Sequence, residues 1–211
     1  SKNKLENCEI NFIKNIPNNS SIIVGHAYGS PKTYGKFINS RLENVLLENS
    51  SKIKNIFFTG DIFFSPSREK WAKLYSFLGN DKRIIIAPGN HDVMFNENSR
   101  FIFNNSVKQE INFPFTFTFQ DFRVIVDDST INSWQLSKKT IKLANQESEN
   151  KEVLILRHNI ANKEFLDLVN SDAGLEKELP DIEELLDTVN KEIIFVVGDG
   201  GAWESKPRFF C

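Results

Sequence analysis

The chain has 211 residues, of which 40% are hydrophobic and 26% are charged, and its formal net charge is −2. These values are typical of one globular domain with a sizeable core, and the small net charge gives no sign of a nucleic-acid partner. The longest unbroken apolar runs have about five residues, far fewer than the ~20 that a membrane-spanning helix needs.

The first twenty residues are polar and rich in Asn, so no signal peptide is visible. Cys8 and Cys211 lie at opposite ends of the chain and do not resemble a disulfide framework. These features favour a reducing compartment, and we therefore expect a cytoplasmic protein. The chain ends on the mostly apolar segment 208–211, which favours a natural protein that continues beyond this point.

Strand-like and helical segments alternate in the first half of the chain. We expect strands at 22–24, 56–58 and 84–87, and helices at about 33–49 and between Ser67 and Gly79. In the second helix Trp71, Leu74, Tyr75 and Leu78 recur at i, i+3, i+4 and i+7, which indicates a buried stripe. Ser67 suits the start of that helix and Gly79 its end.

The second half begins with strict alternation of Phe and Thr over 115–119, which predicts a half-buried antiparallel strand. A turn at Gln120 and Asp121 then leads to a strand at 123–126, so we expect a hairpin. Further elements are expected in this order: a helix at about 135–147, a strand at 153–156, helical turns near 163–170, a helix opened by Pro180, and a strand at 193–197. The pattern predicts an α/β fold with an antiparallel element between parallel halves. Segments 29–36, 62–68 and 93–112 are expected to be loops that line a cleft.

Side chains that can bind a metal ion lie at the ends of five strand-like runs. They are His26, Asp61, the pair Asn90 and His91, His158, and Asp199. Because the carboxyl ends of parallel strands meet at one edge of a sheet, we expect these side chains to lie close together. Imidazole, carboxylate and amide groups form a metal-ligand set.

Three of these motifs, in this order, resemble those of the calcineurin-like metallophosphoesterases. They are Gly60-Asp61, the run Gly89-Asn90-His91-Asp92, and the lone His158, followed by a Gly-rich segment at 198–201. The resemblance covers roughly residues 22–211. It implies a two-sheet β-sandwich flanked by helices in four layers, formed as one domain over residues 1–211.

The resemblance also implies the chemistry of phosphoester hydrolysis. Asp61, Asn90, His158 and Asp199 would hold a divalent ion such as Mn, Fe, Zn or Ni, which suit mixed nitrogen and oxygen ligands. Hydroxide on that ion would attack phosphorus. His91 would act as the general acid, and Asp92 would hold the His91 ring and raise its basicity.

The chain departs from the family at its first and last motifs. Where the family has Asp-x-His, residues 26–28 read His26, Ala27 and Tyr28, and where it has Gly-His-x-His, Asp199 and Gly201 replace the histidines. One metal site therefore keeps a full set of ligand types. The other retains His26, and Tyr28 could join it only as a phenolate, which needs a strong Lewis acid.

Each of these residues also has a structural alternative. Asp61 could cap a helix, His91 could be a hydrogen-bonded loop residue, and Asp199 could belong to a tight turn. His26 could contact metal or phosphate, or shape its turn. Tyr28 could contact substrate or pack, and Arg157 could bind phosphate or be a solvated charge.

Two functions remain open at this stage. The first is a metal-dependent phosphoester hydrolase acting on a phosphorylated small molecule, sugar or lipid, which the retained His91 and Asp92 favour. The second is a catalytically silent relative that binds a phosphorylated ligand or a protein partner, which the altered first motif favours. The sequence does not specify the substrate or the oligomeric state.

Overall fold

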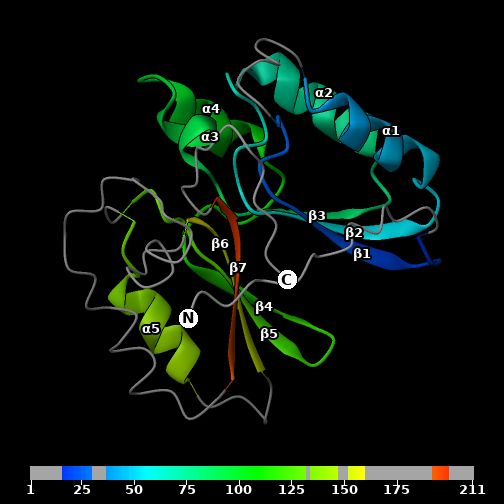
Figure 1. Cartoon of the computed structure of the whole chain (residues 1–211). Coiled ribbons are helices and arrows are strands. Elements are labelled where there is room, and N and C mark those ends of the chain that lie inside the picture. Colours follow the sequence, from blue (N-terminus) through cyan, green and yellow to red (C-terminus); the bar gives the residue numbers. More distant parts are fainter. Residues whose placement is uncertain (1–15, 30–36, 132–133, 147–151, 160–191, 200–211) are drawn as a thin grey trace, which may run out of the picture.

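The computed structural model describes residues 16–29, 37–131, 134–146, 152–159 and 192–199, whose strands form two sheets (Figure 1). The first sheet is parallel and has the order β1 (Ser20–Val24), β2 (Ile53–Phe58), β3 (Arg83–Ile86). The second has the order β4 (Phe115–Phe119), β5 (Phe122–Val126), β6 (Glu152–Asn159), β7 (Ile193–Asp199). Only the β4–β5 pair of this sheet is antiparallel among the described residues.

Helices cover the outer faces of both sheets. The described helices are α1 (Ser40–Glu48), α2 (Arg68–Leu78), α3 (Asn90–Met94), α4 (Ser99–Ser106) and α5 (Lys138–Asn145). In Figure 1, α1 and α2 lie over the first sheet, and α5 lies beside the second. The predicted α/β fold, with two sheets flanked by helices, is therefore confirmed.

Alternate side chains of β6 pack on opposite faces of the second sheet. Leu154 and Leu156 pack into this inter-sheet core, whereas Ile155 packs on the opposite side, with residues of α5. Successive side chains of a strand alternate between its faces. His158 therefore lies on the inter-sheet side and Arg157 on the α5 side.

The boundaries of α2 agree with the sequence signals. The Ser67 side chain accepts a hydrogen bond from the Lys70 N–H (3.2 Å), and Gly79 ends the helix with φ +86°. The predicted stripe of Trp71, Leu74, Tyr75 and Leu78 is buried. The hairpin is also confirmed, because β4 and β5 pair from Phe115–Val126 to Phe119–Phe122.

Two predicted helix starts are wrong, and a capping residue explains each. In place of a start near 33, α1 begins at Ser40, because the Asn39 side chain accepts from the Arg41 N–H (3.0 Å). In place of a start at 135, α5 begins at Lys138, after Ser137 accepts from the Thr140 N–H (3.0 Å).

The segment 93–112, predicted as a loop, contains the end of α3 and the whole of α4. Phe103 is the one apolar side chain of α4 that is fully buried, so the segment lacks the long apolar stripe that marks a helix in sequence. The helical turns predicted at 163–170 and the helix predicted from Pro180 lie outside the described residues.

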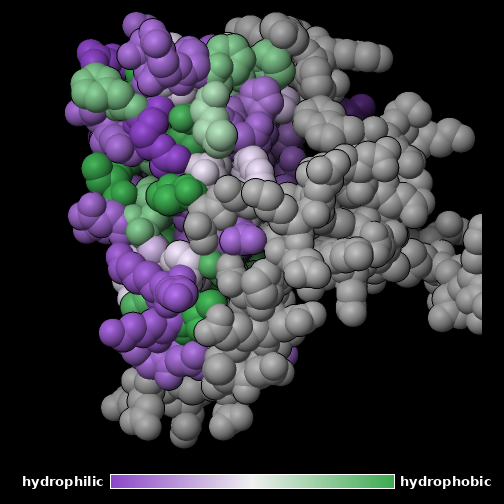
Figure 2. Space-filling view, turned by 90° about the vertical axis from the view of Figure 1, so that its left-hand side faces the viewer, coloured by the Kyte–Doolittle hydropathy of each residue, from purple (hydrophilic) through white to green (hydrophobic). Residues whose placement is uncertain are grey.

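The described helices include none with both the length and the apolar character needed to cross a bilayer. On the face shown in Figure 2, hydrophobic side chains stand among hydrophilic ones. Single exposed apolar side chains of this kind are normal on a protein surface.

Candidate metal centre

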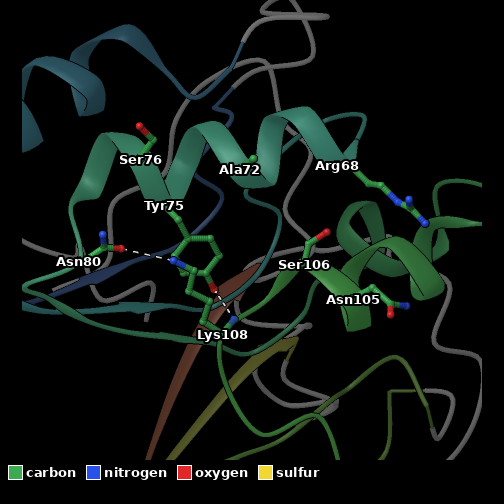
Figure 3. A pocket seen from close by; sticks show the side chains of 8 residues that line it. All are labelled: Arg68, Ala72, Tyr75, Ser76, Asn80, Asn105, Ser106 and Lys108. Atoms are coloured by element: carbon green, nitrogen blue, oxygen red, sulfur yellow. Dashed lines mark hydrogen bonds between the residues drawn. The ribbon is translucent and has the colours of Figure 1, made fainter.

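A hollow of about 670 Å³ lies between α2 and α4, apart from the predicted ligands (Figure 3). Its two cationic side chains already have protein partners. The Lys108 ammonium donates to the Asn80 side chain (3.3 Å), and the Arg68 guanidinium lies 5.6 Å from the centre of the Phe101 ring. The hollow therefore contributes nothing to the predicted metal-ligand set.

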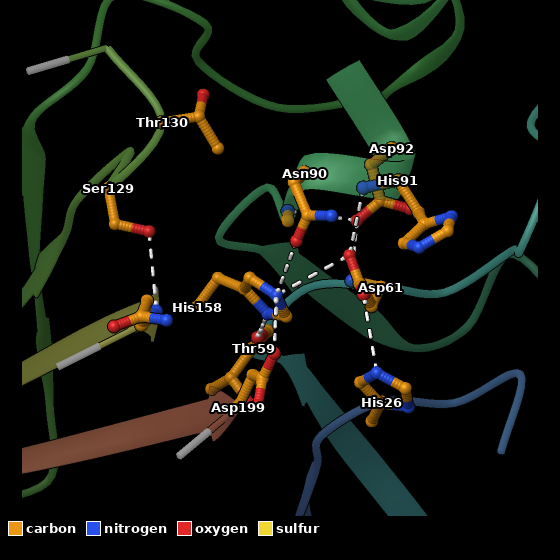
Figure 4. Close-up of polar contacts among 12 residues, drawn as sticks. His26, Thr59, Asp61, Asn90, His91, Asp92, Ser129, Thr130, His158 and Asp199 are labelled. Atoms are coloured by element: carbon orange, nitrogen blue, oxygen red, sulfur yellow. Dashed lines mark hydrogen bonds and ion pairs between the residues drawn. The ribbon is translucent and has the colours of Figure 1, made fainter. Parts of the chain in front are cut away.

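The predicted ligands themselves converge where strands of both sheets end (Figure 4). His158 Nε2 lies 3.1 Å from Asn90 Oδ1, 3.5 Å from Asp61 Oδ1 and 3.9 Å from Asp199 Oδ2. On the other side, His26 Nε2 lies 3.3 Å from Asp61 Oδ2. The structure thus brings together residues separated by more than a hundred positions, as the strand-edge argument predicts.

Asp61 lies at the centre of this cluster. Its two carboxylate oxygens face different histidines, and Oδ1 also accepts a hydrogen bond from the His91 backbone N–H (3.0 Å). Burial opposes ionisation, but the hydrogen bond to His26 and the nearby charges of His158 and His26 hold the pKa of Asp61 below its ordinary value. A buried carboxylate that stays ionised between two imidazoles is suited to hold a cation.

The two imidazole rings are oriented in the same way. His158 Nδ1 lies 2.9 Å from the Thr59 carbonyl oxygen, and His26 Nδ1 lies 3.0 Å from the Gly29 carbonyl oxygen. A carbonyl oxygen only accepts, so each Nδ1 carries a proton. In the neutral ring, each Nε2 then directs a lone pair at a carboxylate oxygen of Asp61. The lone pair and the carboxylate oxygen repel each other unless a proton or a metal ion lies between them. A metal-binding histidine usually donates its other ring N–H to a backbone carbonyl or a carboxylate, as both rings do here.

The donor set fits a divalent transition metal by its chemistry. Carboxylate oxygens from Asp61 and Asp199, the amide oxygen of Asn90 and the imidazole nitrogen of His158 are the mixture that Mn, Fe, Zn and Ni accept. Within the described residues, no group of three or more His, Cys, Asp or Glu side chains could hold an ion by itself. The proposed set therefore depends on Asn90 as well.

The backbone at the site is unusual at His26 and Asp61. Both residues have positive φ, of +49° and +56°. This region is uncommon for residues other than Gly, and its cost is tolerated where the surroundings fix the geometry. Here the backbone N–H of His26 donates to the Gly60 carbonyl (3.2 Å), which joins the end of β1 to the end of β2.

Gly60 and Gly89 allow the two strand ends to approach the ligands, a role that the sequence motifs alone did not reveal. A Cβ on Gly60 would lie 2.5 Å from His158 Nδ1, and one on Gly89 would lie 2.3 Å from Asp61 Oδ1. No Cβ is tolerated at such distances, so both positions need glycine. The glycine preceding each ligand was the available signal.

Tyr28 is a packing residue, and the predicted substrate contact is not supported. Its side chain is 2% exposed, and its ring lies 4.4 Å from the His26 ring and 5.2 Å from the His91 ring, measured between centroids. Burial, followed by the charges of Asp61, Asp199 and Asp92, raises the pKa of Tyr28 above its ordinary value. The phenolate form that could bind metal is therefore disfavoured.

His91 lies beside Asp61, and among the described residues its ring has one hydrogen-bond partner, at Nδ1. Nδ1 lies 2.7 Å from the Phe64 carbonyl oxygen and therefore carries a proton that it donates there. Nε2 is the atom that can exchange a proton with a ligand. This geometry agrees with the predicted role of general acid, which itself stays a prediction.

The predicted support of His91 by Asp92 is wrong, because the Asp92 carboxylate binds backbone N–H groups instead. Oδ2 accepts from Asp61 (2.7 Å) and Gly89 (3.0 Å), and Oδ1 accepts from Ile62 (3.0 Å). Burial and then the charge of Asp61 raise the pKa of Asp92 to about 7, although the three backbone donors oppose the shift. Asp92 therefore fixes the segment that carries Asp61 and supports the ligand set indirectly.

We expect Asp92→Asn to destabilise the fold and to weaken metal binding. The amide keeps the shape of the carboxylate but must turn its NH₂ group toward at least one buried backbone N–H. An unpaired buried donor costs about 1–3 kcal/mol in the free energy of unfolding, measured by urea titration. As a control, Asp81→Asn changes an exposed carboxylate and should leave the midpoint unchanged. An unchanged midpoint in Asp92→Asn would show that the three contacts are unimportant.

Arg157 is neither a phosphate ligand nor a solvated charge, so both predicted readings are wrong. The side chain is fully buried, donates to the Trp134 carbonyl (2.6 Å) and pairs with Asp127 at 3.4 Å. Strand alternation directs it to the α5 side, away from His158. Burial is the largest influence on both partners: it lowers the pKa of Arg157 and raises that of Asp127.

We expect Arg157→Ala to be strongly destabilising, because it leaves the Asp127 carboxylate buried without its cation. Breaking such a pair costs about 3–5 kcal/mol in the free energy of unfolding, whereas an apolar pair of similar volume is often neutral. The double variant Asp127→Leu with Arg157→Met should therefore recover most of the loss in urea titrations. Arg123 hydrogen-bonds Gln146 on the exposed surface, so Arg123→Ala is a matched control with a much smaller loss. Equal losses in the two arginine variants would contradict this account.

Comparisons with known proteins agree with the fold. No protein-family model matches the sequence, and no curated protein matches it. Among solved structures, the chain is similar to a purple acid phosphatase, PPD1, isolated from yellow lupin (Lupinus luteus) seeds, with a TM-score of 0.54 and 13% sequence identity. The similarity covers 85% of this chain but only 38% of the lupin chain. At this sequence identity the similarity shows that the two chains share a fold.

Proposed function

We propose that this chain is a metal-dependent phosphoester hydrolase with one principal metal site. Asp61, Asn90, His158 and Asp199 would hold the ion. The observation that carries the proposal is the orientation of His158, whose Nε2 faces oxygens of the other three while Nδ1 is fixed by the Thr59 carbonyl. The similarity in fold to a phosphatase supports the same reaction class.

The ion would supply the positive charge that neutralises phosphate oxygens and the acidity that makes water a nucleophile near pH 7. The protein's own side chains would do the rest. Asp61, held by Asp92 through its backbone, orients the cation site. His91 donates the proton that the leaving oxygen needs, from Nε2, because Nδ1 is committed to Phe64.

The side of Asp61 that faces His26 offers few ligands for a second ion. On that side of Asp61 the structure places His26, with a buried tyrosine at position 28, and Gly201 lies outside the described residues. Burial lowers the pKa of His26, but the hydrogen bond and charge of Asp61 outweigh it and raise that pKa above its ordinary value. His26 therefore complements the Asp61 carboxylate whether it carries a proton or binds metal.

A catalytically silent phosphate-binding module is the second candidate, and the histidine at position 26 favours it. His26 replaces a carboxylate that the resemblance would place there, so the second ion of a two-metal mechanism has few ligands. Such a module would still bind a phosphorylated ligand through the principal site. It would have no use for His91 Nε2 as a proton donor.

A panel of phosphomonoesters and phosphodiesters separates the two candidates. The protein is first stripped with a chelator and then tested with Mn²⁺, Fe²⁺, Zn²⁺ or Ni²⁺. The hydrolase predicts turnover that appears with metal and disappears with chelator. Binding of inorganic phosphate without turnover of any ester would overturn the hydrolase and support the silent module.

A further inference from the structure

Beside the candidate metal centre, the ring of His91 and two phenylalanine rings contact one another. The Phe64 ring lies 4.7 Å from that of His91 and 5.8 Å from that of Phe95, and His91 and Phe95 are 6.1 Å apart, all between centroids. We call Phe64, His91 and Phe95 the aromatic shelf. Its members come from the segment after β2 and from α3.

The aromatic shelf reaches the protein surface. Phe95 is 44% exposed, and Met94 beside it is 56% exposed, whereas Phe64 and His91 are half-buried. Because Phe95 follows His91 by four residues, both side chains lie on the same side of α3. An isolated exposed phenylalanine needs no explanation. Phe95 is different because its ring contacts the candidate proton donor.

The position of His91 relates the aromatic shelf to a substrate. In Figure 4, His91 and His158 lie on opposite sides of Asp61. If His91 protonates the leaving oxygen of a phosphoryl group bound at the ligand set, that oxygen must come within about 2.6–3.2 Å of Nε2. The carbon group on that oxygen then lies next to the His91 ring, and so close to the Phe64 and Phe95 rings that contact it.

We propose that the aromatic shelf is a leaving-group subsite, and that the substrates are phosphoesters of aryl or other apolar alcohols. The proposal rests on the proposed function, because it takes His91 as the proton donor to the leaving oxygen. Aromatic faces bind rings by stacking and edge contacts and exclude water from them. Sugar and nucleoside hydroxyls would lose their hydration here without gaining hydrogen-bond partners from the Phe64 and Phe95 rings.

The first test measures binding and does not depend on turnover. Calorimetry on the Mn²⁺-loaded protein compares benzylphosphonate with methylphosphonate, which share the phosphoryl group and differ in the apolar group. We expect benzylphosphonate to bind about 10-fold more tightly or better, the usual worth of a small apolar contact. Phe95→Ala should bring the ratio close to one, and Phe95→Leu should keep most of it.

Phe101→Ala is the matched control, because Phe101 is also exposed (56%) but lies against Arg68. It should keep the wild-type ratio. Equal affinity of the wild type for both phosphonates, a ratio that survives Phe95→Ala, or no binding of either would overturn the subsite.

Kinetics then separate the subsite from the proposed function. The ratio of kcat/KM for benzyl phosphate and methyl phosphate should follow the binding ratio in all four proteins. Hydrolysis of both esters without preference would leave the hydrolase standing and overturn the subsite. A binding preference without any hydrolysis would overturn the hydrolase and the leaving-group role with it, and would show that the aromatic shelf binds apolar groups in a silent module.

Discussion

Asp61→Ala is expected to lose metal and phosphoesterase activity together. The Asp61 carboxylate lies between two imidazoles, with Oδ2 3.3 Å from His26 Nε2 and Oδ1 3.5 Å from His158 Nε2, and it is ionised despite its burial. Without it, Asp199 is the anionic residue that remains in the proposed ligand set beside His158 and Asn90. Metal content after gel filtration should fall well below that of the wild type. The rate should fall with it, because the ion supplies the nucleophile.

Asp121→Ala provides the control for Asp61→Ala. Asp121 is an exposed carboxylate in the turn between β4 and β5, so its removal should leave metal content and rate unchanged. Circular dichroism should show that both variants are folded. An Asp61→Ala protein that is folded and keeps its metal would remove Asp61 from the ligand set.

His91→Ala is expected to keep the metal but to slow hydrolysis by around 10²–10⁴-fold, the usual worth of a positioned acid. His91 contacts the ligand set through its backbone N–H, which alanine retains, whereas the Nε2 proton donor is lost. The loss should be large for esters with poor leaving groups and small for 4-nitrophenyl phosphate, which needs little protonation. This dependence separates proton donation from a packing role.

Two outcomes would contradict the assignment of His91. Full activity on a poor-leaving-group ester would show that another group donates the proton. An equal loss on good and poor leaving groups would point to a packing role, since the ring also contacts Tyr28 and Phe64.

Local signals were sufficient to predict most of the fold. Ser67 and Gly79 predicted both ends of α2, because capping depends on a few neighbouring residues. The alternation over 115–119 likewise predicted β4 and its pairing with β5. The predicted start of α1 was wrong because Phe37 and Ile38, which are apolar and buried, come before the Asn39 cap. The apolar pattern in the sequence therefore begins before the helix does.

At the candidate site, the sequence predicted which ligands converge but not the partners of the residues that support them. The convergence of Asp61, Asn90 and His158 followed from the parallel strand order. The partners of Asp92 and Arg157 could not be predicted, because both side chains reach residues distant in the sequence. Asp92 accepts from backbone N–H groups at Asp61 and Ile62, and nothing in a sequence marks such donors.

Arg157 and His158 show the same limit within one strand. The strand was expected to end before them, but β6 continues to Asn159. Pleat alternation therefore places the two side chains on opposite faces, one with Asp127 and the other with Asp61. A shift of three residues in a predicted boundary was enough to misplace the arginine.

The most direct test measures the rate of phosphoester hydrolysis against the number of Mn²⁺ ions bound per chain. The protein is stripped with a chelator, titrated with Mn²⁺ and assayed at each step, with Asn90→Ala beside it. We expect no rate without metal, a rise that saturates near one ion per chain, and a weaker Mn²⁺ affinity in Asn90→Ala. A rate that is independent of bound Mn²⁺, or protein that binds Mn²⁺ and hydrolyses no ester, would contradict the account.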